Sequence, residues 1–329
     1  MPICRDSSKA RIHRVTCSEN TAVTGREPFF SIIIPTYNRP ERISACLQAI
    51  ADQDYPRHRY EVIFVDDGGS ALLEGYLEPF RVRLAVRLLR QEHLGVAVGR
   101  NTGAREARGE ILVFTDDDCR PSPDWLRMLA DSFGDSRDCI VGGRTLNALR
   151  DNPYSTASQA LILYLLDYFN TDPRDARFFN GSNLAVPARL FHILGGFDRA
   201  FLRMGAEERE FCDRWRFHGY GMLYAPEAVV YHVHHLTLRS FIRQHFHYGR
   251  GGFHFQRLHA ARTLRRVRVE PTGFYMGMFR YPFRMERAPR AILVSLLLFV
   301  AQGANAAGYF YEKRQAASGA SVQGQRSLR

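Results

Sequence analysis

Ile111-Leu112-Val113-Phe114-Thr115-Asp116-Asp117-Asp118 is the stretch that decides the fold class, because an apolar β-type run ends there in three adjacent carboxylates. Adjacent anions repel one another, so a strand end tolerates such a cluster mainly where a cation or solvent compensates it. Asp116 and Asp118 point to the same side of an extended chain. Two carboxylates on one side suit a hard divalent cation such as Mg²⁺ or Mn²⁺, shared with substrate phosphates. A solvated acidic turn is the alternative.

Two earlier strands also end in polar residues. The mainly apolar runs at 29–34 and 60–65 are typical of strands buried on both faces. Pro35-Thr36-Tyr37-Asn38-Arg39 follows the first run, and Asp66-Asp67-Gly68 follows the second, where a simple Asp-Gly turn is the alternative. The alternation of strands with helical segments predicts an α/β fold with a mostly parallel sheet, whose ligands gather beyond the carboxyl ends of the strands. We also expect a strand at 82–89 and helices at 41–52, 72–80, 95–107, 155–169 and 207–217.

The bulk composition describes an ordinary globular chain with an excess of positive charge. Its 329 residues carry a formal net charge of +11, which indicates an anionic partner: phosphates, nucleic acid or an acidic membrane face. The basic stretch Arg257–Arg268 has few interleaved aromatic residues, which disfavours nucleic acid. Six cysteines form no CxxC pair, which argues against a zinc ribbon or a disulfide scaffold and favours a reducing compartment. The sequence also lacks the GxxxxGK[ST] and GxGxxG fingerprints.

Three further groups of residues are candidates for chemistry, each with a structural alternative. Arg100 lies early in a predicted helix and suits a phosphate or a base edge, although an exposed surface arginine would look the same. Glu207 and Glu208 begin another predicted helix, either as favourable charges at its N-terminus or as a general base for a hydroxyl nucleophile. His232 and His234 would face the same way in a strand, where neutral imidazoles complete a metal shell or serve packing.

Taken together, these motifs resemble the family 2 glycosyltransferases of GT-A fold, a nucleotide-diphospho-sugar transferase fold with a Rossmann-like sheet, from about Phe30 to Gly252. Each piece is weak or moderate alone, but seven pieces in the family's order make chance agreement very improbable. The pieces are Ser31-Ile-Ile-Ile-Pro-Thr-Tyr-Asn-Arg39, Val65-Asp-Asp-Gly68, Gly99-Arg-Asn-Thr-Gly103, Thr115-Asp-Asp-Asp118, Gly181-Ser-Asn183 through Gly195-Gly-Phe-Asp198, Gly205-Ala-Glu-Glu208 and Val230-Tyr-His232.

The resemblance implies a role for each matched position. Asp116 and Asp118 match the family's DxD motif, which binds the Mn²⁺ or Mg²⁺ that bridges the diphosphate, and His232 falls near that metal. Glu208 falls at the catalytic base, and Glu207 is the second candidate because the family usually has Glu-Asp at this pair. The loop Gly68-Gly69-Ser70 also departs from the family's pattern. The nucleotide would be held by Pro35, Thr36, Tyr37, Arg39, Asp66, Asp67, Arg100 and Asp117.

The apolar segment 291–311 is long enough to cross a bilayer, and it equally suits a helix lying in the membrane interface or a buried helix. Arginines at 280, 284, 287 and 290 precede it, and this bias favours a cytoplasmic catalytic domain if the segment spans. We therefore expect a flexible lead at 1–28, a GT-A catalytic domain at 29–235 with a nucleotide-binding half at 29–120 and an acceptor half at 121–235, a basic helical extension at 236–290, the apolar helix at 291–311 and a disordered tail at 312–329.

The resemblance and the acidic clusters together predict a metal-dependent, inverting transfer of a sugar from a nucleotide sugar, expected to be a UDP-sugar, to an acceptor hydroxyl. The expected partners are this donor and a glycan, lipid-linked or other hydroxyl acceptor, with a membrane as a further candidate partner through 291–311, but no nucleic acid. Such an enzyme would serve cell-surface glycan or glycolipid synthesis, in the cytoplasm or at the cytoplasmic face of the membrane. A catalytically inactive nucleotide- or glycan-binding protein of the same fold and a nucleotidyltransferase are the alternatives.

Overall fold

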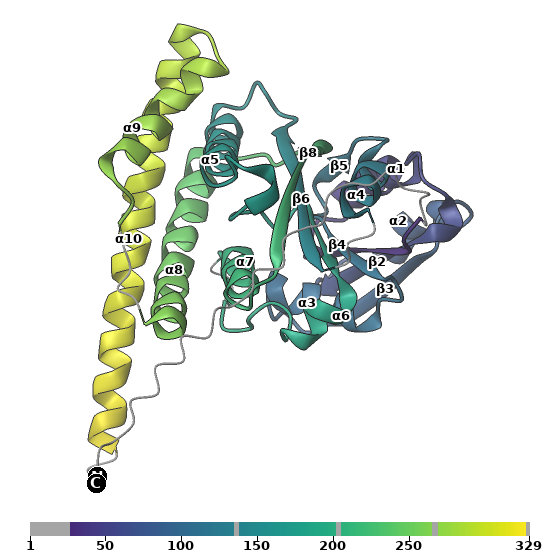
Figure 1. The fold of residues 1–329 in the computed structure, drawn as a ribbon, viewed down its shortest axis with the longest axis horizontal. Coiled ribbons are helices and arrows are strands. Elements are labelled where there is room, and N and C mark those ends of the chain that lie inside the picture. The colour runs from purple at the N-terminus through teal and green to yellow at the C-terminus, as the bar shows by residue number, and fades with distance from the viewer. Residues whose placement is uncertain (1–26, 135–137, 202–204, 265–268, 327–329) are drawn as a thin grey trace, which may run out of the picture.

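The computed structural model describes residues 27–134, 138–201, 205–264 and 269–326, so the predicted N-terminal lead lies outside the described residues up to position 26. Helices and strands alternate through the first half of the described chain, and a helical layer follows (Figure 1). The strands are β1 Phe30–Thr36, β2 Tyr60–Asp67, β3 Val86–Gln91, β4 Ile111–Phe114, β5 Cys119–Pro121, β6 Cys139–Asn147, β7 Leu184–Pro187 and β8 Gly221–His232. The helices are α1 Pro40–Ala51, α2 Glu74–Leu77, α3 Val96–Glu106, α4 Trp125–Phe133, α5 Pro153–Phe169, α6 Ala188–Ile193, α7 Glu207–Phe217, α8 Leu238–Thr263, α9 Thr272–Arg280 and α10 Ala288–Arg326.

The strands form one mixed sheet in the order β3-β2-β1-β4-β7-β6-β8-β5. The four strands from β3 to β4 are parallel, and their register sets Ile33 opposite both Ile63 and Phe114. Beyond β4 the sheet changes direction, because β7 pairs antiparallel with both β4 and β6. The carboxyl ends of β1, β2 and β4 therefore meet at one edge, where the predicted polar clusters come together.

Alternate residues of the buried strands pack on opposite faces of the sheet. Ile32 and Ile34 of β1 belong to a core with α1 and α4, whereas Ile33 belongs to the core on the other face, with Phe114 of β4. Helices α3, α6 and α7 contribute to that second core. Because both faces are covered, β1 and β4 are apolar without alternation, as the sequence predicted.

Several elements differ from the sequence-based predictions. The third strand begins at Val86 rather than Val82, whose side chain is 90% exposed. The helix predicted at 72–80 is only the short α2 followed by a 3₁₀ turn that contains Pro79, because proline cannot continue an α-helix. Helix α4 and strand β6 were not predicted, although Trp125, Leu126 and Leu129 have helical spacing and are fully buried.

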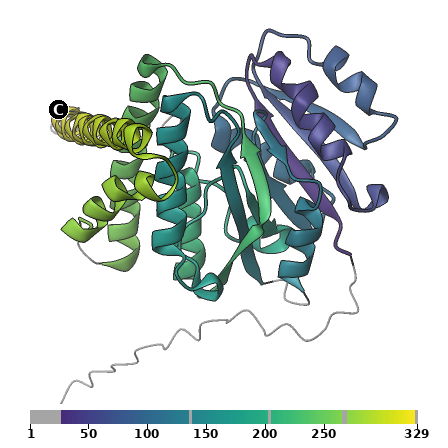
Figure 2. The same ribbon diagram turned by 90° about the horizontal axis from the view of Figure 1, so that it is seen from above.

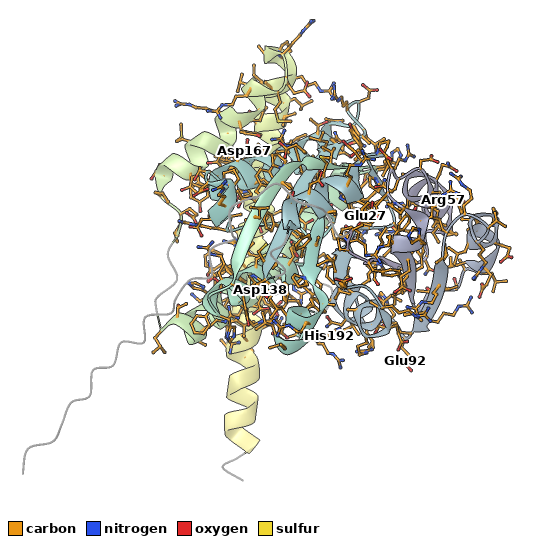
Figure 3. The ribbon with its side chains drawn as sticks, turned by 45° about the vertical axis from the view of Figure 1, so that its right-hand side comes forward. Glu27, Arg57, Glu92, Asp138, Asp167 and His192 are labelled. Carbon is orange, nitrogen blue, oxygen red and sulfur yellow. The ribbon has the colours of Figure 1, made fainter. Side chains whose placement is uncertain are left out.

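Helices α5, α8 and α10 form a layer outside the sheet, and α10 is its outermost member (Figures 1 and 2). A Cβ atom at Gly249 or Gly308 would overlap a backbone carbonyl of the neighbouring helix, so these glycines allow α8 and α10 to pack with their backbones in contact. Asp167 of α5 lies on the side of the molecule that carries α9 (Figure 3), and accepts a 2.6 Å hydrogen bond from the Tyr281 hydroxyl. Helix α10 continues to Arg326, through most of the tail expected to be disordered.

Candidate active site

The three carboxylates after β4 have different partners. Asp116 Oδ1 accepts a 2.8 Å hydrogen bond from Arg100 Nη2, and Asp118 Oδ2 accepts one of 2.5 Å from Arg42 Nη1. Asp117 Oδ2 accepts a 2.7 Å hydrogen bond from the Thr36 hydroxyl. Asp117 and Asp118 are 2% and 7% exposed, so the solvated acidic turn is excluded. Two arginine side chains and a threonine hydroxyl from neighbouring elements stabilise the three carboxylates instead.

Four potential metal ligands gather beside these contacts. One ligand atom from each of Asp116, Asp118, Cys119 and His232 lies within 4.8 Å of the others. The register of β5 with β8 sets Cys119 opposite His232 and so brings the histidine to the strand end. Burial, followed by the charges of Asp116 and Asp118, raises the pKa of the Cys119 thiol well above its usual value, which makes this group a weak ligand. Two carboxylates and an imidazole remain, a ligand set that fits Mn²⁺ or Mg²⁺.

Electrostatics couple the carboxylate and the imidazole of this cluster. His232 Nε2 lies 3.0 Å from Asp118 Oδ1, so the two groups form an ion pair when the imidazole is protonated. Burial lowers the pKa of His232, but the negative charge of Asp118 outweighs it and the pKa is raised. Burial conversely raises the pKa of Asp118, and His232 with Arg42 more than offsets it, so the pKa is held below its usual range. A cation that replaced the proton of His232 would take over this charge interaction with Asp118.

Asp117 points away from the metal cluster, toward the end of β1. Besides the Thr36 hydroxyl, its carboxylate faces Arg39, whose Nη1 lies 3.4 Å from Oδ1. Burial and then the charge of Asp118 raise the pKa of Asp117 to about 6. Asp117 thus joins the predicted nucleotide residues of the β1 loop to the DxD motif, through two contacts that the sequence did not reveal.

Asp67, one of the residues predicted to hold the nucleotide, supports the neighbouring loop. Asp67 accepts hydrogen bonds from the backbone N–H groups of Leu94 and Gly95 at 2.9 and 2.8 Å. The His93 ring nitrogen lies 2.9 Å from the same carboxylate, and the ring stacks on Tyr37 at 3.9 Å between centroids. Asp66 binds the backbone N–H of Gly69 and closes the turn after β2. The Tyr37–His93 stack was not predicted, since His93 is outside every quoted motif.

Arg100 lies between the metal cluster and the start of α7. Its Nη1 donates a 2.9 Å hydrogen bond to Glu207 Oε1, and its Nη2 binds Asp116. The Arg100 and Glu207 side chains are only 4% and 5% exposed, so the exposed surface arginine is excluded. A side chain at Gly181 would collide with the guanidinium, which explains the glycine there. Burial lowers the pKa of Arg100, but Asp116 and Glu207 raise it overall, so the guanidinium stays charged.

The two glutamates at the start of α7 have separate environments. Gly205 and Ala206 precede the helix, each with a φ of +72°, and this turn brings the first residues of α7 into the cavity. Glu207 faces Arg100, whereas Glu208 is half-buried and lines the cavity. Burial and then the charge of Glu207 raise the pKa of Glu208 to about 8, against the opposing effect of Arg100. Of the two, Glu208 is therefore the carboxyl that no arginine binds within the part of the chain that the structure describes, and it is able to exchange a proton.

One cavity of about 1380 Å³ is lined by most of these groups, although not by Asp66 or Cys119. It runs from Tyr37 and His93 past Asp116 and Glu208 to the helical layer, and it exceeds the roughly 300–1,000 Å³ of a typical small-ligand pocket. On the helical side it meets two buried histidines, His234 and His245, whose ring nitrogens have no hydrogen-bond partner among the described residues. Burial lowers their pKa values to about 3 and about 4, so both rings are neutral. The apolar lining on this side comes from Leu161, Ile162, Leu165, Phe169, Phe274 and Met278.

Comparison with known proteins gives one family match and several relatives. A family model described as glycosyl transferase family 2 matches residues 31–205. Glycosyltransferase AglE of Haloferax volcanii is 36% identical over 124 residues, which are 37% of this chain and 40% of that protein. The chain spans about half or less of the length of the curated relatives it matches.

Solved structures resemble the whole fold. The mannosyltransferase PcManGT from Pyrobaculum calidifontis, in complex with GDP-Man and Mn²⁺, has a TM-score of 0.56 at 22% identity and covers 92% of this chain and 84% of its own. TarS 1–349 of S. aureus, in complex with UDP-GlcNAc, has a TM-score of 0.55 at 17% identity and covers 88% of this chain and 92% of its own. These similarities confirm the predicted fold class, a helix-flanked sheet of GT-A type with a C-terminal helical region.

Proposed function

Because the chain belongs to glycosyl transferase family 2, as its ordered motifs predicted, we propose that it transfers a sugar from a nucleotide sugar to an acceptor hydroxyl with inversion of configuration. One observation supports this most strongly: the Asp116, Asp118 and His232 cluster and the Glu208 carboxyl line the same cavity. The first can stabilise a diphosphate leaving group, and the second can accept the proton of an attacking hydroxyl.

The proposed metal ligands are Asp116, Asp118 and His232, which would hold Mn²⁺ or Mg²⁺. When bound, the cation supplies positive charge against the oxygens of the departing diphosphate. Arg42 and Arg100 hold the Asp118 and Asp116 carboxylates in place through hydrogen bonds of 2.5 and 2.8 Å. Their positive charges also offset part of the negative charge at the site. The proton of His232 must leave before its imidazole can serve as a ligand, so metal affinity should increase with pH.

The proposed nucleotide site lies at the β1 and β2 ends of the cavity, between Pro35 and Arg39. Tyr37 is 41% exposed and already stacked on His93, so its free face can stack on a base. Asp117 fixes the Thr36 hydroxyl, and Asp66 and Asp67 shape the surrounding turns. We propose a UDP-sugar, since TarS 1–349 shares this fold and was solved with UDP-GlcNAc.

Glu208 is the proposed general base. Its position in the cavity and its pKa near 8 suit a group that exchanges protons close to neutral pH. Glu207 is a positioning residue, because its carboxylate is held by Arg100. In this account residues 29–120 form the donor half and 121–235 the acceptor half of a cytoplasmic catalytic domain, which acts on a glycan or lipid-linked acceptor in surface glycan or glycolipid synthesis.

The Glu208→Gln variant tests this function. We expect its turnover to fall by about 10²- to 10⁴-fold, the usual contribution of a general base, while its donor affinity stays within about twofold of wild type. Glu78→Gln, at a side chain that is 74% exposed and does not line the cavity, is the matched control and should leave turnover unchanged. Unchanged turnover in Glu208→Gln would remove this residue from its role. Release of pyrophosphate in place of a nucleoside diphosphate would identify a nucleotidyltransferase.

A further inference from the structure

Helix α10 packs one face against the protein and leaves the opposite face uncovered, at the outer edge of the molecule (Figures 1 and 2). Val294 and Ala301 are fully buried in a cluster with Ala157 of α5 and Phe241 of α8. The opposite face, here called the apolar stripe of α10, consists of Ile292, Leu293, Leu296, Phe299, Val300, Gly303, Ala307, Phe310 and Tyr311, all of which are exposed.

The apolar stripe is too long to be ordinary surface. At 1.5 Å per residue, positions 292–311 extend over about 30 Å. The most apolar window of this helix has a mean hydropathy of 1.7 and is only 33% buried. Phe299 and Leu296 are 69% and 61% exposed, although soluble proteins seldom expose large apolar side chains side by side. A continuous apolar surface of this kind needs a partner.

The charges around the stripe indicate what that partner is. Arg280, Arg284 and Arg287 are exposed just before it, and Lys313 and Arg314 are exposed just after it. Phe283 and Met285 are exposed among these arginines, and no acidic residue occurs between positions 288 and 311. An apolar face with basic residues at both ends complements an anionic lipid surface, where arginine and lysine meet headgroups and apolar side chains enter the acyl boundary.

The packing of α8 determines how the helix can lie. Phe241 of α8 packs with Val294, Leu297 and Ala301, and Arg250 of α8 binds Glu312 at 2.6 Å, so α8 lies beside α10 along the whole stripe. If α10 crossed a bilayer in this conformation, Arg243 and Arg250 of α8 would be carried into the hydrocarbon, which is strongly unfavourable. A helix that lies along the surface leaves α8 and its arginines on the protein side.

We propose that the apolar stripe of α10 lies in the plane of an anionic membrane surface, with both basic flanks in the headgroup layer on the same side. Tyr309 and Phe310 of α10 also line the cavity, so the cavity reaches the helix that contacts the membrane. An acceptor carried in that membrane therefore enters beside α10. This last consequence rests on the proposed function, whereas membrane binding is measured without turnover.

Sedimentation of the full chain with lipid vesicles tests the surface. Wild type should sediment with phosphatidylcholine vesicles that contain phosphatidylglycerol, and less with pure phosphatidylcholine. The variant Leu296→Gln/Phe299→Gln, changed at positions that are 61% and 69% exposed, should lose vesicle affinity by about tenfold or more. Leu72→Gln/Val82→Gln, at side chains 77% and 90% exposed on the donor half, is the matched control and should bind as wild type.

The orientation of α10 relative to the membrane is measured by cysteine labelling of vesicle-bound protein with a membrane-impermeant maleimide. Cys4 and Cys17 are first replaced by serine. Arg287→Cys and Lys313→Cys should both be labelled from outside. Labelling of only one flank would mean that α10 spans the bilayer, and would overturn the proposal.

The proposal also fails if wild type does not sediment, if the stripe variant binds normally, or if that variant changes only the dimerisation of the chain. Nucleoside diphosphate release in vesicle-free solution reports separately on the proposed function.

Discussion

Replacing Arg100 by methionine should destabilise the protein far more than an ordinary loss of a salt bridge. Arg100 binds Glu207 at 2.9 Å and Asp116 at 2.8 Å, and the Glu207 side chain is only 5% exposed. Methionine has a similar length but no charge, so the Glu207 carboxylate would remain buried without a partner. Asp116 is 29% exposed and can be partly rehydrated, so most of the cost should come from Glu207.

Removal of one partner from a buried ion pair typically costs about 3–5 kcal/mol. Since water can reach Asp116, we expect the lower end, about 3 kcal/mol, for Arg100→Met at pH 7. The double variant Arg100→Met/Glu207→Gln removes the stranded charge and should recover part of this loss. Arg189→Met is the matched control: its partner is Asp138 at 3.6 Å, the two side chains are 73% and 52% exposed, and the expected loss is about 0–1 kcal/mol.

Urea unfolding followed by circular dichroism measures these free energies, provided that the denaturant slope stays constant across the variants. A loss below about 1 kcal/mol in Arg100→Met, or a double variant no more stable than the single one, would refute the reasoning. In that case Arg100 would be solvated rather than a buried bridge, and the assignment of Glu207 as a positioning residue would fail with it.

Four further outcomes are expected. Asp118→Asn should weaken Mn²⁺ binding by at least about tenfold in calorimetric titration, and an unchanged affinity would remove Asp118 from the ligand set. Tyr37→Ala should lower nucleotide affinity by about 5- to 150-fold in equilibrium dialysis, the value of roughly 1–3 kcal/mol per stacked base, and no loss would exclude stacking there. The pKa of Glu208 is raised to about 8, so turnover should increase with pH as this base ionises. The folded protein also holds that proton more tightly than the unfolded chain, so stability present below the unfolded pKa should be lost as pH rises through about 8. Glu208→Gln should flatten this slope in urea unfolding between pH 6 and 9, and equal slopes would contradict it.

Much of the catalytic domain could be predicted, because its strands and acidic clusters can be recognised from short stretches of neighbouring residues. A buried strand is a continuous apolar run, and the carboxylates that follow it reach the ligand edge of the sheet through strand geometry alone. Asp116 and Asp118 therefore lie at this edge without any knowledge of the packing, whereas His232 reaches them only through the pairing of β5 with β8. The start of α7 was predictable for the same reason, since Glu207 and Glu208 follow a glycine that ends the preceding turn.

The remaining contacts depend on tertiary packing. Arg100 and Glu207 are 107 positions apart, and only the junction of α3 with α7 brings them together and separates the roles of the two glutamates. The Tyr37–His93 stack needs the loop after β3, whose residues carry no recognisable pattern. The sequence likewise left three placements open for the helix at 291–311: across a bilayer, along the membrane interface, or buried in the protein. Contacts between α8 and α10 favour the placement along the membrane interface, because they show which face of α10 is covered by the protein.

The release of nucleoside diphosphate from a panel of nucleotide sugars, with Mn²⁺ and then with EDTA, tests the central claim most directly. The account predicts release from one donor that stops when EDTA removes the metal, returns with added Mn²⁺, and is lost in Asp118→Asn. Release that continues unchanged in EDTA and in Asp118→Asn would contradict the proposed metal site at the end of β4.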